Sequence, residues 1–140
     1  MVLAATNRPQ DLDEAIRRRL EKRVYIPLPD EVSREHLFKI NLKSELVSED
    51  VNYKKLVART EGYSGADLSN VCRDAAMAPM RKMLDRTGFN IEDLANPANE
   101  INKTPLTMED FEEAIKKNQP SVSKGNLKEF EEWMAEFGSC

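Results

Sequence analysis

The chain has 140 residues, of which 40% are hydrophobic and 33% are charged, as expected of a single globular domain. Lys and Arg number 21 against 25 Asp and Glu, and the formal net charge of -4 disfavours a general nucleic-acid or membrane-surface binder. Two cysteines and one histidine are too few for a disulfide framework or a His/Cys zinc site. No apolar run approaches the roughly 20 residues of a membrane-spanning helix. We therefore expect neither a metal site nor a membrane span.

The first 29 residues predict a strand, a short helix and a second strand. Val2–Ala5 is an apolar run of strand length, and Pro9 prevents a ladder or helix from continuing. Asp13–Leu20 has helical spacing of its apolar residues, and Arg23–Ile26 is a second strand-like run that ends at Pro27. This order indicates an α/β unit.

After residue 29 the pattern predicts helices. Asp30 can cap a helix over 30–43, with Val32, Leu37 and Ile40 as its apolar stripe and Phe38 as a further candidate. A second helix fits residues 52–60, where Leu56 and Val57 point inward and Gly62 provides the stop.

Three further helices follow, one of them long. Ser64 and Asp67 have the spacing of a capping box at the start of a helix over 64–86, which Pro79 should kink. Residues 87–106 indicate an irregular connection. Thr107 with Asp110 opens the next helix, and the last runs over 126–137.

Four segments together resemble the AAA ATPase family. Three resemble its second region of homology and one resembles its helical-lid motif: Ala4–Pro9, Leu12–Leu20, Tyr25–Pro29 and Glu61–Leu68. The resemblance implies a mainly α fold, namely a helical lid subdomain with two strands and a short helix that remain from a truncated α/β subdomain. It divides the chain into residues 1–29 from the α/β subdomain, 30–120 as the lid and 121–140 as a C-terminal helix.

The resemblance assigns catalytic roles to three residues in the first segment. Asn7 matches the sensor-1 position, where a neutral amide can orient the attacking water. Arg18 and Arg19 match paired arginine fingers, which stabilise the γ-phosphate charge of a neighbouring subunit. The alternatives are a turn residue for Asn7, and a solvated face or a small nucleic-acid patch for the arginines. The low net charge and the lack of interleaved aromatic residues disfavour nucleic acid.

The same resemblance places four residues beside the nucleotide. Gly65 and Ala66 lie at a helix start, where the backbone can approach adenine and ribose closely. Leu37 and Asn41 match positions that border the base and the sugar, although many relatives have His at the position of Asn41. The alternative for all four is ordinary helix-start and core packing.

Two stretches narrow the resemblance to the katanin group within the meiotic clade. The segment 17–29 has Leu20 where the endosomal-sorting disassembly ATPase and spastin usually have Phe, and the segment 121–140 resembles the katanin catalytic C-terminus. The resemblance implies a hexameric parent that uses ATP and Mg²⁺ to sever microtubules in the cytoplasm. Its expected partners are neighbouring ATPase subunits, tubulin and a regulatory subunit. Alternatives remain, namely a spastin-like or endosomal-sorting relative and a non-catalytic helical interaction module.

The 140 residues contain no Gly-x-x-x-x-Gly-Lys-Ser/Thr run and no acidic pair at the end of an apolar strand. We therefore expect this chain alone to bind no cofactor tightly and to hydrolyse no ATP. The two predicted strands would flank a missing strand in the family's sheet. We expect a stable helical unit from residue 31 onward, and residues 1–29 to be mobile, mispaired or packed against another copy.

Overall fold

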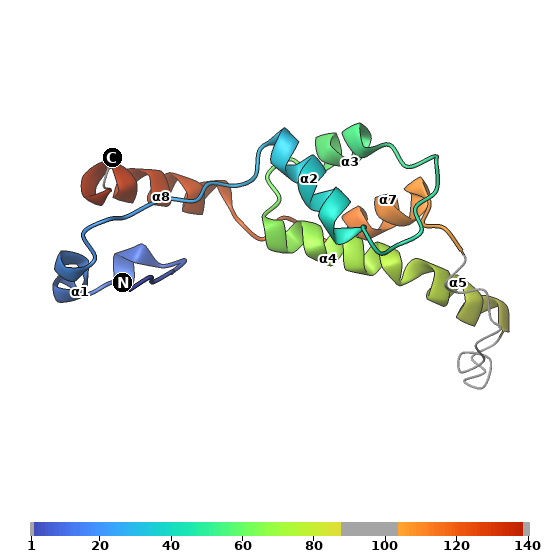
Figure 1. The fold of residues 1–140 in the computed structure, drawn as a ribbon, viewed down its shortest axis with the longest axis horizontal. Coiled ribbons are helices and arrows are strands. Elements are labelled where there is room, and N and C mark those ends of the chain that lie inside the picture. The colour runs from blue at the N-terminus through green and yellow to red at the C-terminus, as the bar shows by residue number, and fades with distance from the viewer. Residues whose placement is uncertain (1, 88–103, 139–140) are drawn as a thin grey trace. The chain divides into compact units, whose positions relative to one another are not determined.

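The computed structural model describes residues 2–87 and 104–138, and these are mainly helical (Figure 1). The chain divides into two compact units, one over Leu28–Ser121 and one that combines the chain before Leu28 with the chain after Ser121. The elements, in chain order, are η1 (Pro9–Asp11), α1 (Glu14–Arg19), α2 (Glu31–Asn41), α3 (Tyr53–Arg59), α4 (Gly65–Ala76), α5 (Ala78–Thr87), α7 (Met108–Lys117) and α8 (Lys124–Phe137).

In the unit Leu28–Ser121, helix α4 is the centre of the packing. Helices α2 and α7 both pack on α4, and α3 packs on α2 (Figure 1). The spacing of apolar residues along α4, at every third or fourth position, explains why it lies at the centre. The side chains on this face are all buried, namely Leu68, Val71, Cys72 and Ala75. The other buried apolar side chains include Phe38, Leu42, Val51, Leu56, Val57, Tyr63, Leu106, Phe111 and Ala114.

The helix starts predicted at Asp30 and Asn52 are confirmed, because each is set by a local cap. The Asp30 carboxylate accepts from the Ser33 N–H at 2.8 Å, and the Asn52 side chain accepts from the Lys55 N–H at 3.2 Å. Helix α3 ends shortly before Gly62, whose φ of +79° is a left-handed conformation that suits glycine.

The long helix predicted over 64–86 is interrupted, as Pro79 suggested. Helix α4 ends at Ala76 and α5 begins at Ala78. Proline has no N–H to donate to the carbonyl four residues earlier, here that of Ala75. The N–H of Met77, the residue between the two helices, donates to the carbonyl of Arg73 at 3.2 Å.

The predicted apolar stripe of α2 is wrong for two of its members. The side chains of Val32 and Ile40 are exposed by 67% and 68%, whereas Phe38 is completely buried and Leu37 is half-buried. The inward face of α2 also carries Arg34, a charged residue that a hydrophobicity pattern assigns to solvent. The face that packs on α4 is therefore rotated from the face that the sequence indicated.

The two predicted strands, Val2–Ala5 and Arg23–Ile26, do not form among the described residues. An isolated apolar run gains no ladder of hydrogen bonds without a neighbouring strand, so its strand propensity is not realised. Segment 9–25 contacts α8 of the same chain, through η1 and through the Tyr25 ring, which lies 6.2 Å from that of Phe130. The expectation that residues 1–29 are mobile, mispaired or packed against another copy stays a prediction.

Helix α8 begins at Lys124, two residues before the predicted start, because Ser123 caps it through the Asn126 N–H at 3.2 Å. Most of the predicted connection 87–106 lies outside the described residues.

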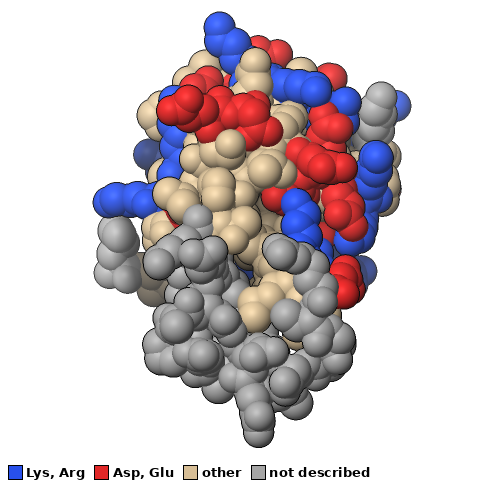
Figure 2. Space-filling view, turned by 90° about the vertical axis from the view of Figure 1, so that its right-hand side faces the viewer, with Lys and Arg blue, Asp and Glu red and all other residues tan. Residues whose placement is uncertain are grey.

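In the described part of the chain, no helix has the length and apolar character needed to cross a bilayer. Figure 2 shows acidic and basic side chains intermixed on the part of one face that belongs to described residues.

Candidate functional site

Four residues predicted to lie beside the nucleotide meet where α2 packs on α4. Gly65 is the first residue of α4, and a Cβ atom built on it would lie 3.9 Å from Cδ1 of Leu37 on α2. That distance is an ordinary van der Waals contact, so the described neighbours leave room for a side chain at this position. Ala66 is exposed and Leu37 is half-buried, which leaves an accessible small-residue surface at the helix start.

The amide of Asn41 is held on the same side of α2. Its Nδ2 donates to the carbonyl of Leu37 at 2.8 Å, and its Oδ1 accepts from the Ser69 hydroxyl on α4 at 3.2 Å. A primary amide has two N–H donors, so one remains beyond these bonds for a further acceptor. The structure thus brings Leu37, Asn41, Gly65 and Ala66 together and adds Ser69 to them.

The first turn of α4 is fixed by a buried carboxylate. Asp67, 6% exposed, accepts from the backbone N–H and the hydroxyl of Ser64 at 2.9 and 2.8 Å. Its Oδ2 also accepts from the backbone N–H and the hydroxyl of Ser121 at 3.2 and 3.0 Å. Burial acts to raise the pKa of Asp67, but these four hydrogen bonds outweigh it and hold the pKa below the ordinary value. The carboxylate is therefore ionised near neutral pH.

This cap leaves backbone donors at the start of α4. The described hydrogen bonds use the N–H of Ser64 and of Asp67, but none uses those of Gly65 and Ala66. The first N–H groups of a helix have no intrahelical acceptor and carry partial positive charge. Together with the space around Gly65, these donors fit a polar, planar or anionic group of a ligand.

The predicted arginine fingers lie on α1, which Asp13 caps through the Ala15 N–H at 2.6 Å. Arg18 and Arg19 are both exposed. The Arg18 side chain forms an ion pair with Glu14 at 2.5 Å, and its 78% exposure means that water screens this pair. Both guanidinium groups are therefore accessible to a partner molecule.

Asn7 is exposed and lies in a bend before η1. The neighbouring Thr6 hydroxyl accepts from the Arg8 N–H at 3.0 Å, which shapes the turn. The described residues 2–5 form no strand for Asn7 to follow, so its sensor-1 role remains a prediction. Among residues 2–87 and 104–138, which the structure describes, no group of three or more His, Cys, Asp or Glu side chains is placed to hold a metal ion.

Comparison with known proteins identifies a domain within the chain. The sequence profile of the AAA+ lid domain matches residues 50–113. Residues 50–113 are an AAA+ lid domain. The whole chain is 55% identical to the A1 form of the katanin p60 ATPase-containing subunit from Arabidopsis thaliana. Over 99% of its length it is 52% identical to the A-like 1 form from Danio rerio, and it spans only 27% and 28% of these two relatives.

The fold of the chain resembles those of solved AAA domains. The AAA domain of FIGL-1 has a TM-score of 0.80 and 36% identity, over 96% of this chain and 43% of that one. The same FIGL-1 domain in complex with ADP also has a TM-score of 0.80, at 33% identity. A solved structure that concerns the structural basis of katanin self-assembly has a TM-score of 0.76 and 34% identity, over 91% of this chain and 44% of that one.

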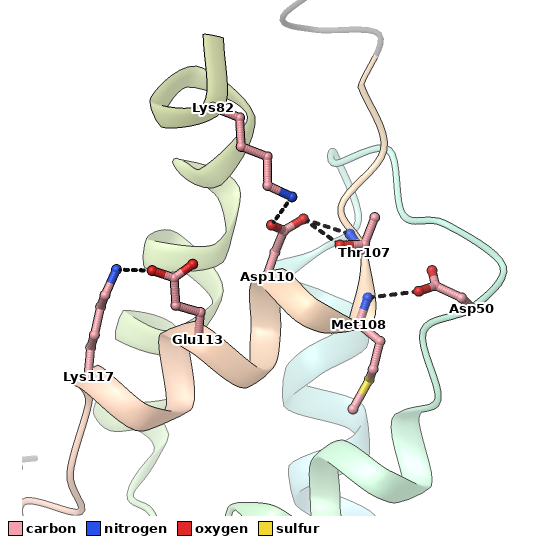
Figure 3. A network of polar contacts seen from close by, with 7 residues as sticks. All are labelled: Asp50, Lys82, Thr107, Met108, Asp110, Glu113 and Lys117. Atoms are coloured by element: carbon pink, nitrogen blue, oxygen red, sulfur yellow. Dashed lines mark hydrogen bonds and ion pairs between the residues drawn. The ribbon is translucent and has the colours of Figure 1, made fainter. Parts of the chain in front are cut away.

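Inside the lid domain, a polar network joins α5 to α7 (Figure 3). The buried Asp110 carboxylate forms an ion pair with Nζ of Lys82 at 2.6 Å and accepts from the N–H and hydroxyl of Thr107 at 2.9 and 2.8 Å. Burial acts to raise the pKa of Asp110, but the Lys82 and Thr107 hydrogen bonds lower it overall. In the same network, the Asp50 carboxylate accepts a hydrogen bond from the N–H of Met108 at 3.1 Å. These contacts stabilise the packing of α5 and Asp50 against the start of α7.

Sequence reasoning missed two residues that shape the lid site, Ser69 and Ser121. Ser69 lies four residues after Gly65, so the helical repeat puts it on the same face of α4, and this spacing could have revealed it. The bond between Ser121 and Asp67 joins residues 54 positions apart, and no local pattern signals such a contact.

Proposed function

We propose that this chain is the lid-bearing, C-terminal part of a katanin-like AAA ATPase. In this proposal the parent protein forms a hexameric ring, hydrolyses ATP and severs microtubules in the cytoplasm. Its partners are neighbouring ATPase subunits, tubulin and a regulatory subunit. The observation that carries the proposal is the similarity to katanin subunits along the whole of this chain, at about half of all positions.

We propose that the α2–α4 junction binds the base and sugar of the nucleotide. Leu37 would pack on the adenine, Gly65 and Ala66 would let the backbone approach it, and the remaining N–H of Asn41 would donate to the ligand. Bound ATP with Mg²⁺ would supply the phosphoanhydride bond that is broken. The room around Gly65 and the unused N–H groups at the start of α4 support this assignment.

We further propose that residues 1–29 derive from the α/β subdomain, residues 30–120 form the lid and residues 121–140 form a separate C-terminal helix. Asn7 would orient the attacking water, and Arg18 and Arg19 would stabilise the charge that develops on the γ-phosphate of a neighbouring subunit. The exposure of both arginines supports a role toward another molecule.

The test uses the full-length ATPase that contains this chain. Arg18→Ala and Arg19→Ala should each abolish ATP hydrolysis and microtubule severing while a fluorescent ATP analogue still binds with wild-type affinity. Subunits that carry Arg18→Ala should also inhibit wild-type subunits when the two are mixed. Wild-type turnover by either variant would refute the finger assignment. ATPase activity without severing in the unsubstituted enzyme would favour an endosomal-sorting relative.

A non-catalytic interaction module is the second candidate, favoured by the two exposed apolar side chains of α2, Val32 and Ile40. Apolar side chains in contact with water favour association with a partner. The 140-residue chain would be added to the full-length ATPase. Inhibition in proportion to its concentration would support a chain that binds ATPase subunits, and unchanged activity would refute this function.

A further inference from the structure

The side chain of Arg23 bridges the ends of two helices. Its Nη2 donates to the carbonyl of Arg17 in the last turn of α1, and its Nη1 donates to the carbonyl of Phe137 at the end of α8, both at 2.5 Å. Carbonyls in the last turn of a helix lack an intrahelical donor and carry partial negative charge. A guanidinium group offers a rigid fork of charged donors, so it suits two such carbonyls at once.

Two aromatic contacts reinforce this bridge on the same helix. The guanidinium carbon of Arg17 lies 4.8 Å from the centre of the Phe137 ring, within the range of a cation–π interaction. The Phe137 ring also lies 5.5 Å from that of Trp133, one turn earlier. Residues 17–25 are therefore attached to α8 through a charged bridge, a cation–π contact and the Tyr25–Phe130 pair.

This attachment determines which way α1 presents its arginines. A helix of six residues is too short to be stable by itself, so its formation depends on contacts with the rest of the unit. Successive helical residues are rotated by about 100°. Once Arg17 faces Phe137, the directions of Arg18 and Arg19 are fixed, and both are exposed.

We infer that Arg23 is a positioning residue, which holds α1 against the end of α8 so that Arg18 and Arg19 reach the neighbouring subunit. This inference rests on the proposed finger roles of Arg18 and Arg19. The inference assigns two different roles to the arginines of segment 17–23. Arg17 and Arg23 attach α1 to α8, and Arg18 and Arg19 act on the partner.

The first test measures steady-state ATP hydrolysis by the full-length enzyme. Arg23→Gln should lower kcat by at least about tenfold, since a displacement of about 1 Å can cost up to about 100-fold. The KM for ATP should stay within about twofold, because the nucleotide contacts made by the variant's own lid do not change. Arg23→Lys keeps the charge but loses the fork, so it should restore part of kcat. Lys22→Gln removes an adjacent exposed charge and is the control, so its kcat and its KM for ATP should equal those of the wild type.

The second test uses the 140-residue chain, whose single tryptophan, Trp133, lies beside the bridge. Arg23→Gln should increase acrylamide quenching of Trp133 fluorescence, while Lys22→Gln should leave it unchanged. Far-UV circular dichroism would verify that α2–α7 remain folded in each variant. Unchanged quenching in Arg23→Gln would overturn the bridge itself.

The outcomes separate this inference from the proposed function. If Arg18→Ala and Arg19→Ala abolish hydrolysis while Arg23→Gln has wild-type kcat, the fingers stand and the positioning role is overturned. A raised KM at wild-type kcat in Arg23→Gln would overturn it as well. If Arg18→Ala and Arg19→Ala both retain turnover, the finger assignment fails whatever Arg23 does.

Discussion

The guanidinium group of Arg34 donates to the backbone carbonyl of Val57 at 3.2 Å, which ties α2 to the last turn of α3. The same side chain donates to the carbonyl of Pro29 at 2.9 Å and is only 6% exposed. A buried charge persists in a fold only where hydrogen bonds replace its water. Arg34 therefore acts as a polar core residue that joins α2 to α3 and to the segment before α2.

Arg34→Ala should strongly destabilise the chain. It removes two charge-assisted hydrogen bonds, so the free energy of unfolding should fall by about 3 kcal/mol, although the Val57 carbonyl keeps the N–H and hydroxyl of Thr60 as donors. Urea denaturation followed by circular dichroism measures this change. Lys117→Ala, which removes an exposed ion pair with Glu113, is the control and should cost less than about 0.5 kcal/mol. Equal losses in the two variants would contradict the structural role of Arg34.

The carboxylate of Asp67 predicts a loss of stability in acid. Its pKa is lower in the folded chain, so its ionised form stabilises the fold above the unfolded pKa of about 3.9. This contribution is lost as the pH falls through the folded pKa. In Asp67→Asn the unfolding free energy should therefore fall less steeply below about pH 4 than in the wild type, as measured by urea denaturation at several pH values.

A double-mutant cycle tests the contact between Asp67 and Ser121. Ser121→Ala alone should cost about 1 kcal/mol at neutral pH, because one hydrogen bond to a buried carboxylate is lost. In the Asp67→Asn background the same substitution should cost clearly less. Additive costs would mean that the two side chains do not interact in solution.

Gly65→Ala separates the fold from the proposed nucleotide site. The added methyl group meets only an ordinary contact with Leu37, and alanine favours a helix more than glycine does, so thermal stability should stay equal or rise slightly. If a nucleotide lies against this backbone, the methyl group should weaken its binding to the full-length enzyme by about tenfold, or ~1.4 kcal/mol. Titration with a fluorescent ATP analogue measures this affinity.

Gly125→Ala is the matched control for that experiment. Gly125 also lies in the first turn of a helix, α8, and a Cβ atom there would meet the Ser123 hydroxyl at 3.7 Å. This substitution should change neither stability nor nucleotide affinity appreciably. Equal affinities for the Gly65→Ala and Gly125→Ala enzymes would place the nucleotide elsewhere.

The thiol of Cys72 should be inert in the folded chain. Cys72 lies in the core between α4 and its neighbours, and burial raises its pKa to about 12. Thiolates react with alkylating agents and thiols do not, so at pH 8 iodoacetamide should modify Cys72 only as fast as the chain opens. The measurement uses Cys140→Ser, in which Cys72 is the one remaining cysteine, with and without urea. Rapid modification without urea would contradict the burial.

The helix starts could be predicted because a cap depends on residues three positions apart. Asp30, Asn52 and Ser64 each carry an oxygen that reaches the N–H groups of the following turn, whatever lies elsewhere in the fold. For the same reason the interruption at Pro79 was visible in the sequence. These features require no knowledge of distant segments.

The face of α2 could not be predicted in the same way. Val32 and Ile40 have the spacing of a core stripe, yet Phe38 and Arg34 point inward. The choice between these faces depends on which one fits α4 and on which carbonyls need a donor, and both are tertiary properties. The predicted strands failed for a related reason, since strand pairing requires a partner that the segment itself does not supply.

The candidate site was predicted only in part. Leu37, Asn41, Gly65 and Ala66 come together as expected, because the family resemblance already contains their tertiary relationship. Ser69 was missed. The roles of Arg17 and Arg23 could not be inferred from a basic run in which all members look alike, since contact with α8 alone distinguishes them.

The parallel bridge at Val47 and Leu106 bears on how this lid can vary between proteins. Leu106 is buried, its N–H donates to the carbonyl of Leu46 at 2.8 Å, and its carbonyl accepts from Ser48 at 2.9 Å. With the Lys82–Asp110 pair, these bonds fix the chain on both sides of residues 88–103. Each doubling of a closed loop costs only about 0.6 kcal/mol. A longer connection between these anchors should therefore cost the unit Leu28–Ser121 little stability.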